Sequence, residues 1–179
     1  MRERLAAMDI GAVPPTRFEH CIRTGLNMGA AYTHASASVR AHIAVYTALA
    51  VTIDNWEVGS DGIEEFVPRI LAGSPQLHPL LDRYLDVLKE TQHYFQPYAV
   101  SAIVTNAIQF VNSMLLDKHE EGTSVQEKSL PYARYKRARN GLGEVFGFFL
   151  WDKTIFPSAP LHAEVIAYVF TAPPCMIFR

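Results

Sequence analysis

The sequence predicts an all-α protein, and three observations lead to this fold class. Its longer apolar runs have the length of helices and follow a helical period, and no segment alternates polar and apolar residues as a half-buried strand does. Of the 179 residues, 49% are hydrophobic and only 19% are charged. Such a chain can bury a core and has too few charges to remain disordered. We therefore expect one helical domain over residues 1–179.

In the first half of the chain, proline and polar residues divide the apolar segments. Residues 1–27 are expected to be a less regular N-terminal segment, because Pro14 and Pro15 break an early helix. Residues 28–53 are apolar on most faces, which indicates one buried helix. Asp54 and Asn55 end this helix, and residues 59–62 form a loop. A short helix over 64–71 follows.

The second half contains clearer helical stripes. Leucines and a tyrosine over 77–88 give an amphipathic helix after Pro75 and Pro79, and residues 97–118 form a longer one. Residues 120–129 are a polar loop. Helix is then predicted over 132–139, interrupted at Asn140 and Gly141, and resumed over 142–150. A last helix is expected over 161–169.

Charge and cysteine content exclude several classes of function. The net charge of −2 leaves no basic field for nucleic acid, so we expect no nucleic-acid partner. Cys21 and Cys175 lie far apart and form no zinc-like pair, which fits a cytoplasmic protein. The longest apolar run, over 43–53, is shorter than the roughly 20 residues that span a bilayer. We therefore expect no transmembrane segment.

The first candidate site lies where the apolar helix ends. Asp54 offers a carboxylate, and Asn55 and Glu57 follow it within the same short stretch. Magnesium prefers oxygen ligands and keeps several waters, so one or two carboxylates beside a phosphate hold it. The competing interpretation is a turn, because Asp and Asn favour turns by themselves.

The second candidate site is the stretch Arg137-Ala138-Arg139-Asn140-Gly141. Arginine binds a diphosphate through two parallel hydrogen bonds, which lysine cannot reproduce. Arg137 stands one helical turn before the Asn140-Gly141 interruption. The competing interpretation is an ordinary helix end, with Gly141 after the last turn and Arg137 as a charge that complements the helix dipole.

Together these two stretches resemble the fungal class I terpene cyclases of the trichodiene synthase family. In that family an Asp-rich motif closes one helix, and an arginine that senses diphosphate precedes a break in another. The resemblance implies a partial class I terpenoid synthase bundle that binds Mg2+ through Asp54, more weakly through Asn55 and Glu57. Arg137, Asn140 and Gly141 would be the catalytic residues. The implied substrate is a prenyl diphosphate such as farnesyl diphosphate, which is ionised and cyclised.

The resemblance runs from about residue 29 to about residue 168 and stops where the family's second metal motif should begin. The chain is therefore expected to be an incomplete domain of such an enzyme. The alternative function is an inactive, truncated homologue that acts as a helical prenyl-diphosphate-binding or interaction module. Apolar faces left uncovered would favour a homodimer or other association. A third interpretation is a helical scaffold in which these residues only cap and pack.

Two further groups of residues are expected to be structural. Tyr46, Phe110 and Phe146 stand at helical spacings typical of a core, although aromatic faces also stabilise carbocations. Asp117, His119 and Glu120 resemble a metal cluster, but their position at a helix end before a polar loop favours a solvated terminus.

Overall fold

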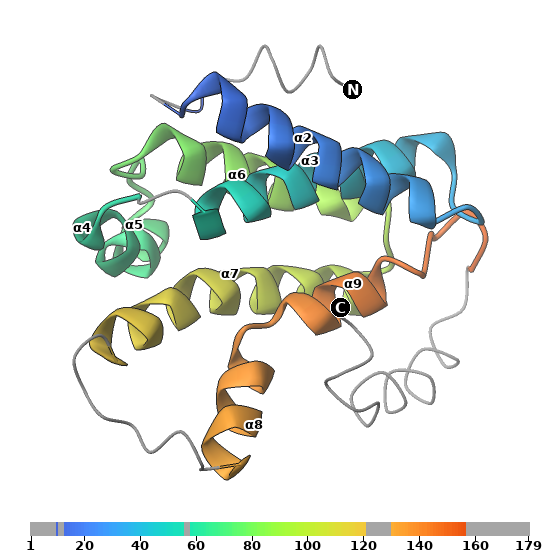
Figure 1. Cartoon of the computed structure of the whole chain (residues 1–179). Helices are drawn as coiled ribbons and strands as arrows, with labels where there is room; N and C mark the ends of the chain where they lie inside the picture. Colours follow the sequence, from blue (N-terminus) through green and yellow to red (C-terminus); the bar gives the residue numbers. More distant parts are fainter. Residues whose placement is uncertain (1–9, 11–12, 56–57, 121–129, 157–179) are drawn as a thin grey trace.

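A computed structural model describes residues 10, 13–55, 58–120 and 130–156, and its regular elements in these ranges are all helices (Figure 1). The prediction of an all-α protein is confirmed. In chain order the elements are α2 (Pro15–Ala31), α3 (Ala37–Asn55), α4 (Ser60–Glu64), α5 (Phe66–Ala72), α6 (Pro79–Glu90), the 3-10 turn η1 (Thr91–His93), α7 (Pro97–Glu120), α8 (Leu130–Arg139) and α9 (Leu142–Phe148). The loop was expected over 120–129, and all of it except residue 120 lies outside the described residues. The helix expected over 161–169 also lies outside them.

The N-terminal part of the chain differs from the prediction in one respect. Residues 15–27, expected to be less regular, belong to helix α2, which begins at Pro15. Proline is tolerated at the first helical position because the amide hydrogen that it lacks would have no partner within the helix. Pro15 therefore starts a helix, whereas the sequence analysis expected it to break one.

The prediction of one long helix over 28–53 is also wrong. Helix α2 ends at Ala31 and α3 begins at Ala37, so the chain turns between them. Ser36 ends the turn and caps α3, with its hydroxyl oxygen 3.4 Å from the Val39 amide nitrogen. A serine at this position satisfies an amide that has no partner within the helix. The predicted end of α3 at Asp54 and Asn55 is confirmed.

From α4 to α7 the prediction is nearly right. Residues 59–62 were expected to be a loop, but α4 begins at Ser60, so two short helices replace the predicted one over 64–71. Helix α6 starts at Pro79, where the His78 side chain accepts a hydrogen bond from the Leu80 amide. Both α6 and α7 follow the predicted stripes.

Helices α2 and α3 pack closely as an upper layer in Figure 1. Gly25 and Gly29 make this approach possible, because a Cβ atom at either position would collide with a backbone carbonyl of α3, that of Ala44 or Arg40. Replacing either glycine would therefore push the two helices apart.

The core lies between α3, α6 and α7. Tyr46 and Tyr84 are fully buried, and their hydroxyl oxygens lie 3.0 Å apart. The Tyr84 hydroxyl also lies 3.3 Å from the Ala107 carbonyl oxygen of α7. Buried hydroxyls need such partners, so this network fixes the three helices in one register.

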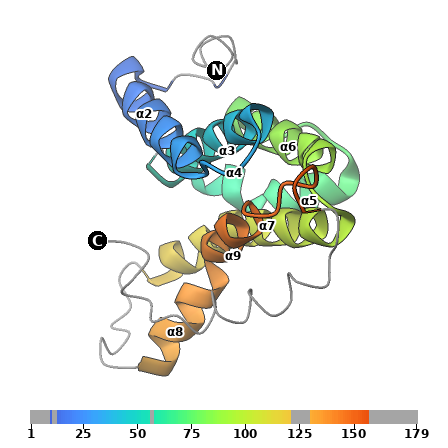
Figure 2. The ribbon, with the colours of Figure 1, turned by 90° about the vertical axis from the view of Figure 1, so that its right-hand side faces the viewer.

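The last two described helices differ in their attachment. Helix α9 packs along α7, with Val145 and Phe148 fully buried. Helix α8 projects away from the layer of α2 and α3 in both views (Figures 1 and 2). Its sequence is polar around most of its circumference, so it has no apolar face to bury deeply.

Among the described helices, α7 is long and apolar enough to cross a membrane by length and composition, with a mean hydropathy of 1.5 over its most apolar stretch. The core helix of a soluble protein passes the same test. Helix α7 packs against α4, α5, α6 and α9, and a third of its apolar stretch is buried among the described residues. The absence of a membrane span and the cytoplasmic location stay predictions.

The segment after α9 returns to the start of α3 and is tied there by Asp152. This residue has no exposed surface, and its carboxylate accepts hydrogen bonds from the Ser36 amide at 2.9 Å and the Thr154 amide at 2.9 Å. The Thr154 hydroxyl donates a third at 2.7 Å. Burial raises the pKa of Asp152, but these hydrogen bonds outweigh it and hold the pKa below its usual 3.8.

We expect Asp152→Asn to lower the free energy of unfolding by about 1–3 kcal/mol at neutral pH, because the buried donors lose an ionised acceptor. Since the folded-state pKa is depressed, this contribution is present above the unfolded-state value of 3.8 and is lost as pH falls through the folded value. Chemical denaturation of both proteins across this range measures it. Asp61→Asn, at an exposed position in α4, is the control. A deficit that stays constant on acidification would rule out the carboxylate charge as its cause.

Candidate functional site

A cavity of about 300 Å³ lies where the end of α3 faces α7 and the break between α8 and α9. Its lining combines carboxylates, cations, an amide and apolar side chains. The residues are Asp54, Phe110, Ser113, Met114, Asp117, Lys136, Arg137 and Asn140. Asp54 and the Arg137–Asn140 stretch, which the sequence analysis treated as two separate candidates, are thus brought to one cavity.

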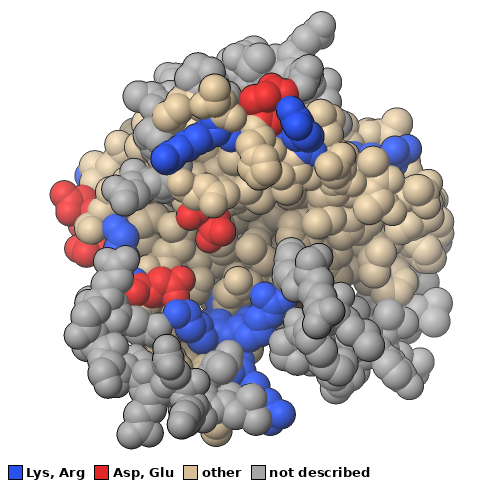
Figure 3. All heavy atoms as spheres, viewed as in Figure 1, with Lys and Arg blue, Asp and Glu red and all other residues tan. Residues whose placement is uncertain are grey.

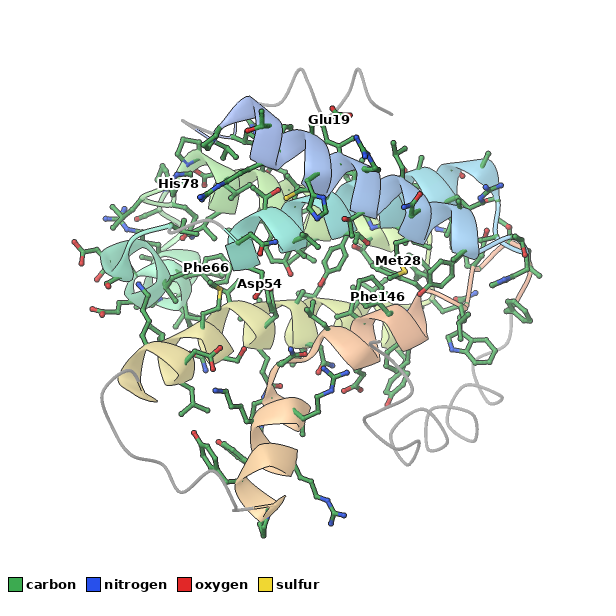
Figure 4. All side chains as sticks on the ribbon, in the orientation of Figure 1. Glu19, Met28, Asp54, Phe66, His78 and Phe146 are labelled. Carbon is green, nitrogen blue, oxygen red and sulfur yellow. The ribbon has the colours of Figure 1, made fainter. Side chains whose placement is uncertain are left out.

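Asp54 occupies the last turn of α3 and points toward α7 (Figure 4). Ile53 is fully buried beside it, so the helix end is anchored in the core while the carboxylate stays exposed at the cavity. Partial burial raises the pKa of Asp54, and the negative charge of Asp117 raises it further. The two carboxylates are therefore close enough to repel each other, and a cation between them would relieve this repulsion.

The helix break predicted at Asn140 and Gly141 is confirmed as a structural feature. Gly141 has a φ of 66°, in the left-handed region, and its Cα faces the backbone of Asn106 on α7. A Cβ atom here would collide with the Asn106 carbonyl oxygen. Both the backbone angle and the close approach require glycine.

Asn140 stabilises the break from the α8 side. The backbone amide of Asn140 donates a hydrogen bond to the Lys136 carbonyl at 3.1 Å and so closes the last turn of α8. The Leu142 amide lies 2.7 Å from the Asn140 carbonyl oxygen and 3.2 Å from its side-chain oxygen. Asparagine can form such a turn with its own side chain, which explains its place before the glycine.

Helix α8 supplies the positive wall of the cavity through Lys136 and Arg137. Lys136 Nζ lies 2.6 Å from Asp117 Oδ1, so this cation already has a carboxylate partner across the cavity. In Figure 3, Lys and Arg side chains gather over α8 in a hollow of this face, with carboxylates beside and above them. One wall of the cavity is thus suited to a cation and the other to an anion.

Asn55, one of the predicted metal ligands, does not line this cavity in the structure. Asn55 lines a different surface pocket, against α2, and its side-chain amide donates to the Val51 carbonyl at 2.9 Å. Glu57 lies outside the described residues. Of the proposed metal ligands, Asp54 is the one that the described structure places beside Arg137 and Asn140.

Sequence reasoning missed the contribution of α7. Asp117 was expected to be part of a solvated terminus, yet it faces Asp54 and pairs with Lys136. Asn106 was not considered, although Gly141 packs closely against its backbone carbonyl. Residues 97–118 contain two asparagines, Asn106 and Asn112, and their sequence did not indicate that Asn106 would be the buried one.

The donor set fits a divalent cation beside a phosphate. Asp54 offers hard oxygen atoms, and Mg2+ completes its shell with water and phosphate oxygen when few carboxylates are present. In the described part of the chain, no group of three or more His, Cys, Asp or Glu side chains could hold a metal by itself. A metal at this cavity would therefore depend on ligands from an anion.

A helical bundle with a carboxylate at one helix end and an arginine before a break in another is the arrangement that the resemblance to class I terpene cyclases implies. The chain matches the family model of trichodiene synthase (TRI5) over residues 4–178 and belongs to this family. The match extends beyond residues 29–168, the range over which the resemblance was first noted.

Named fungal relatives support the same family. The chain is 32% identical over 151 residues to terpene synthase BipA of Cochliobolus sativus, covering 82% of this chain and 46% of the relative. It is 29% identical over 148 residues to terpene synthase 29 of Postia placenta, covering 81% and 44%. For longiborneol synthase CLM1 of Gibberella zeae the identity is 28% over 134 residues, covering 72% and 40%. The chain thus spans somewhat less than half the length of these relatives.

We expect Gly141→Ala to lower the free energy of unfolding by more than the ~1–3 kcal/mol that an unfavourable backbone angle costs, because the new Cβ also meets the Asn106 carbonyl. Gly73→Ala is the matched control, since Gly73 has a φ of 63° and open space around its Cα. Urea denaturation of the two variants separates the cost of the angle from that of the contact. Equal losses would show that the contact with α7 contributes nothing.

Proposed function

We propose that this protein is a terpene synthase that binds a prenyl diphosphate such as farnesyl diphosphate with Mg2+ and promotes its ionisation and cyclisation. The observation that carries the proposal is the cavity that joins Asp54 of α3 to Arg137 and Asn140 at the break of α8. Membership of the trichodiene synthase family supports the same chemistry.

In this proposal the diphosphate lies against α8. Arg137 binds it through its planar guanidinium group, which matches two phosphate oxygens at once. Asn140 and Gly141 transmit the position of Arg137 to α9, because the Asn140 turn and the contact of Gly141 with Asn106 link the two helices. A movement of α8 is thereby coupled to the helix that carries Phe146.

Mg2+ would be held by Asp54, and when bound it supplies positive charge that stabilises the departing diphosphate. Phe110 and Met114 form an apolar part of the same cavity wall. This side is suited to the start of the prenyl chain, while the charged residues hold its diphosphate. The chain's own residues thus orient the reacting bond between an apolar and a charged wall.

The test is incubation of the purified chain with farnesyl diphosphate and Mg2+, with diphosphate release and volatile products followed together. We expect Asp54→Ala and Arg137→Ala to lower diphosphate release by roughly 100-fold or more, the usual effect of removing one group that stabilises developing charge. Arg134→Ala is the control, because Arg134 is exposed on the same helix and does not line the cavity. An equal loss in the control would contradict the assigned role of Arg137.

The second candidate is a non-catalytic module that binds prenyl diphosphate or another protein. The observation that favours it is that Asn55, one of the predicted metal ligands, lines a different pocket and donates to the Val51 carbonyl. Soluble, helical protein that binds Mg2+ and inorganic pyrophosphate but releases none from farnesyl diphosphate would establish this alternative. Cyclic product that disappears in Asp54→Ala would exclude it.

A further inference from the structure

The Asp117–Lys136 ion pair is the starting point. It joins α7 to α8 directly, at a Nζ–Oδ1 distance of 2.6 Å, and both residues line the cavity. Lys136 precedes Arg137 in the sequence, so both cations of the cavity come from one turn of α8. Lys136 is therefore held by a carboxylate of the protein itself.

The attachment of α8 makes this pair important for the position of the helix. Helix α8 projects from the body of the protein and contacts α7 at few places (Figures 1 and 2). A second cavity of about 230 Å³ lies between α7 and the other side of α8, lined by Tyr135 and Arg139 among others. Among the described residues, this ion pair and the contact at Gly141 are specific contacts that orient α8 between the two cavities.

We propose that Asp117 is a positioning residue that holds Lys136 in a latch, and that an incoming diphosphate opens this latch by taking Lys136 as its own partner. The inference rests on the proposed function, because it assigns the anion to the same cavity. It adds that Lys136 is an anion-contacting residue and that Asp117 competes with the anion for it.

The strength of the pair suits such an exchange. The side chains of Lys136 and Asp117 are 39% and 57% exposed, so water weakens their attraction. A diphosphate carries more negative charge than one carboxylate and also contacts Arg137, so it wins the competition for Lys136. Opening the latch frees α8 to move toward the anion about the break at Gly141.

The test is a double-mutant cycle on the binding of inorganic pyrophosphate in excess Mg2+, measured by calorimetry. We expect Lys136→Met to weaken binding about 3- to 10-fold, and Asp117→Asn to tighten it about 2- to 5-fold, the range set by a partly exposed ion pair. In the Lys136→Met background, Asp117→Asn should have no effect, because the cation for which it competes is absent.

Two other results would overturn the latch. If Asp117→Asn tightens binding equally in both backgrounds, Asp117 acts only by repelling the anion at a distance. If Asp117→Asn weakens binding, its carboxylate helps to hold the Mg2+ complex and does not oppose it. Lys118→Met and Asp61→Asn are the charge-matched controls, since neither residue lines the cavity.

Hydrogen exchange of the ligand-free protein tests the latch without any ligand. The α8 amides should exchange faster in Lys136→Met and in Asp117→Asn, and no faster in the double variant than in either single one. Unchanged exchange in both variants would contradict the latch. Failure of the wild-type chain to bind Mg2+ and pyrophosphate would instead contradict the proposed function, so the two failures are distinguishable.

Discussion

The contact between Gly141 and the Asn106 carbonyl is the constraint on which the candidate site depends. It brings the chain so close to α7 that no side chain fits, and it fixes the point where α8 leaves the body of the protein. Because α9 packs along α7 from this point, α8 must project at an angle. That angle turns Lys136 and Arg137 toward the end of α3, where Asp54 stands. One backbone contact thus brings both signs of charge to one cavity.

The cavity separates these charges by helix. Its carboxylates come from the ends of α3 and α7, and its cations come from α8. Ile53 anchors the end of α3 in the core, whereas α8 contacts α7 at few places among the described residues, so Asp54 is held more firmly than the cations. Such an arrangement allows an anion to change the position of α8 without disturbing the network of Tyr46 and Tyr84.

Periodicity and turn residues were sufficient to predict α6, α7 and the break at Gly141, because each of these depends on local sequence. The turn between α2 and α3 was missed because it is held by distant groups, such as the Phe146 carbonyl, which accepts a hydrogen bond from the Tyr32 hydroxyl at 2.7 Å. Asp54 and Arg137 were found as separate candidates, but their meeting depends on α7. The role of Asp117 follows from packing and has no local pattern.

The tie at Asp152 has a consequence for synthesis of the chain. The turn before α3 makes contacts to Phe146, Leu150 and Asp152, between 114 and 116 residues later. A nascent chain on the ribosome lacks these partners until the segment around residue 150 has emerged. The turn before α3 can therefore form these contacts only after nearly all of the described chain has been synthesised. Contacts this distant in sequence slow folding. Truncation before Asp152 removes the carboxylate that accepts a hydrogen bond from the Ser36 amide at the start of α3.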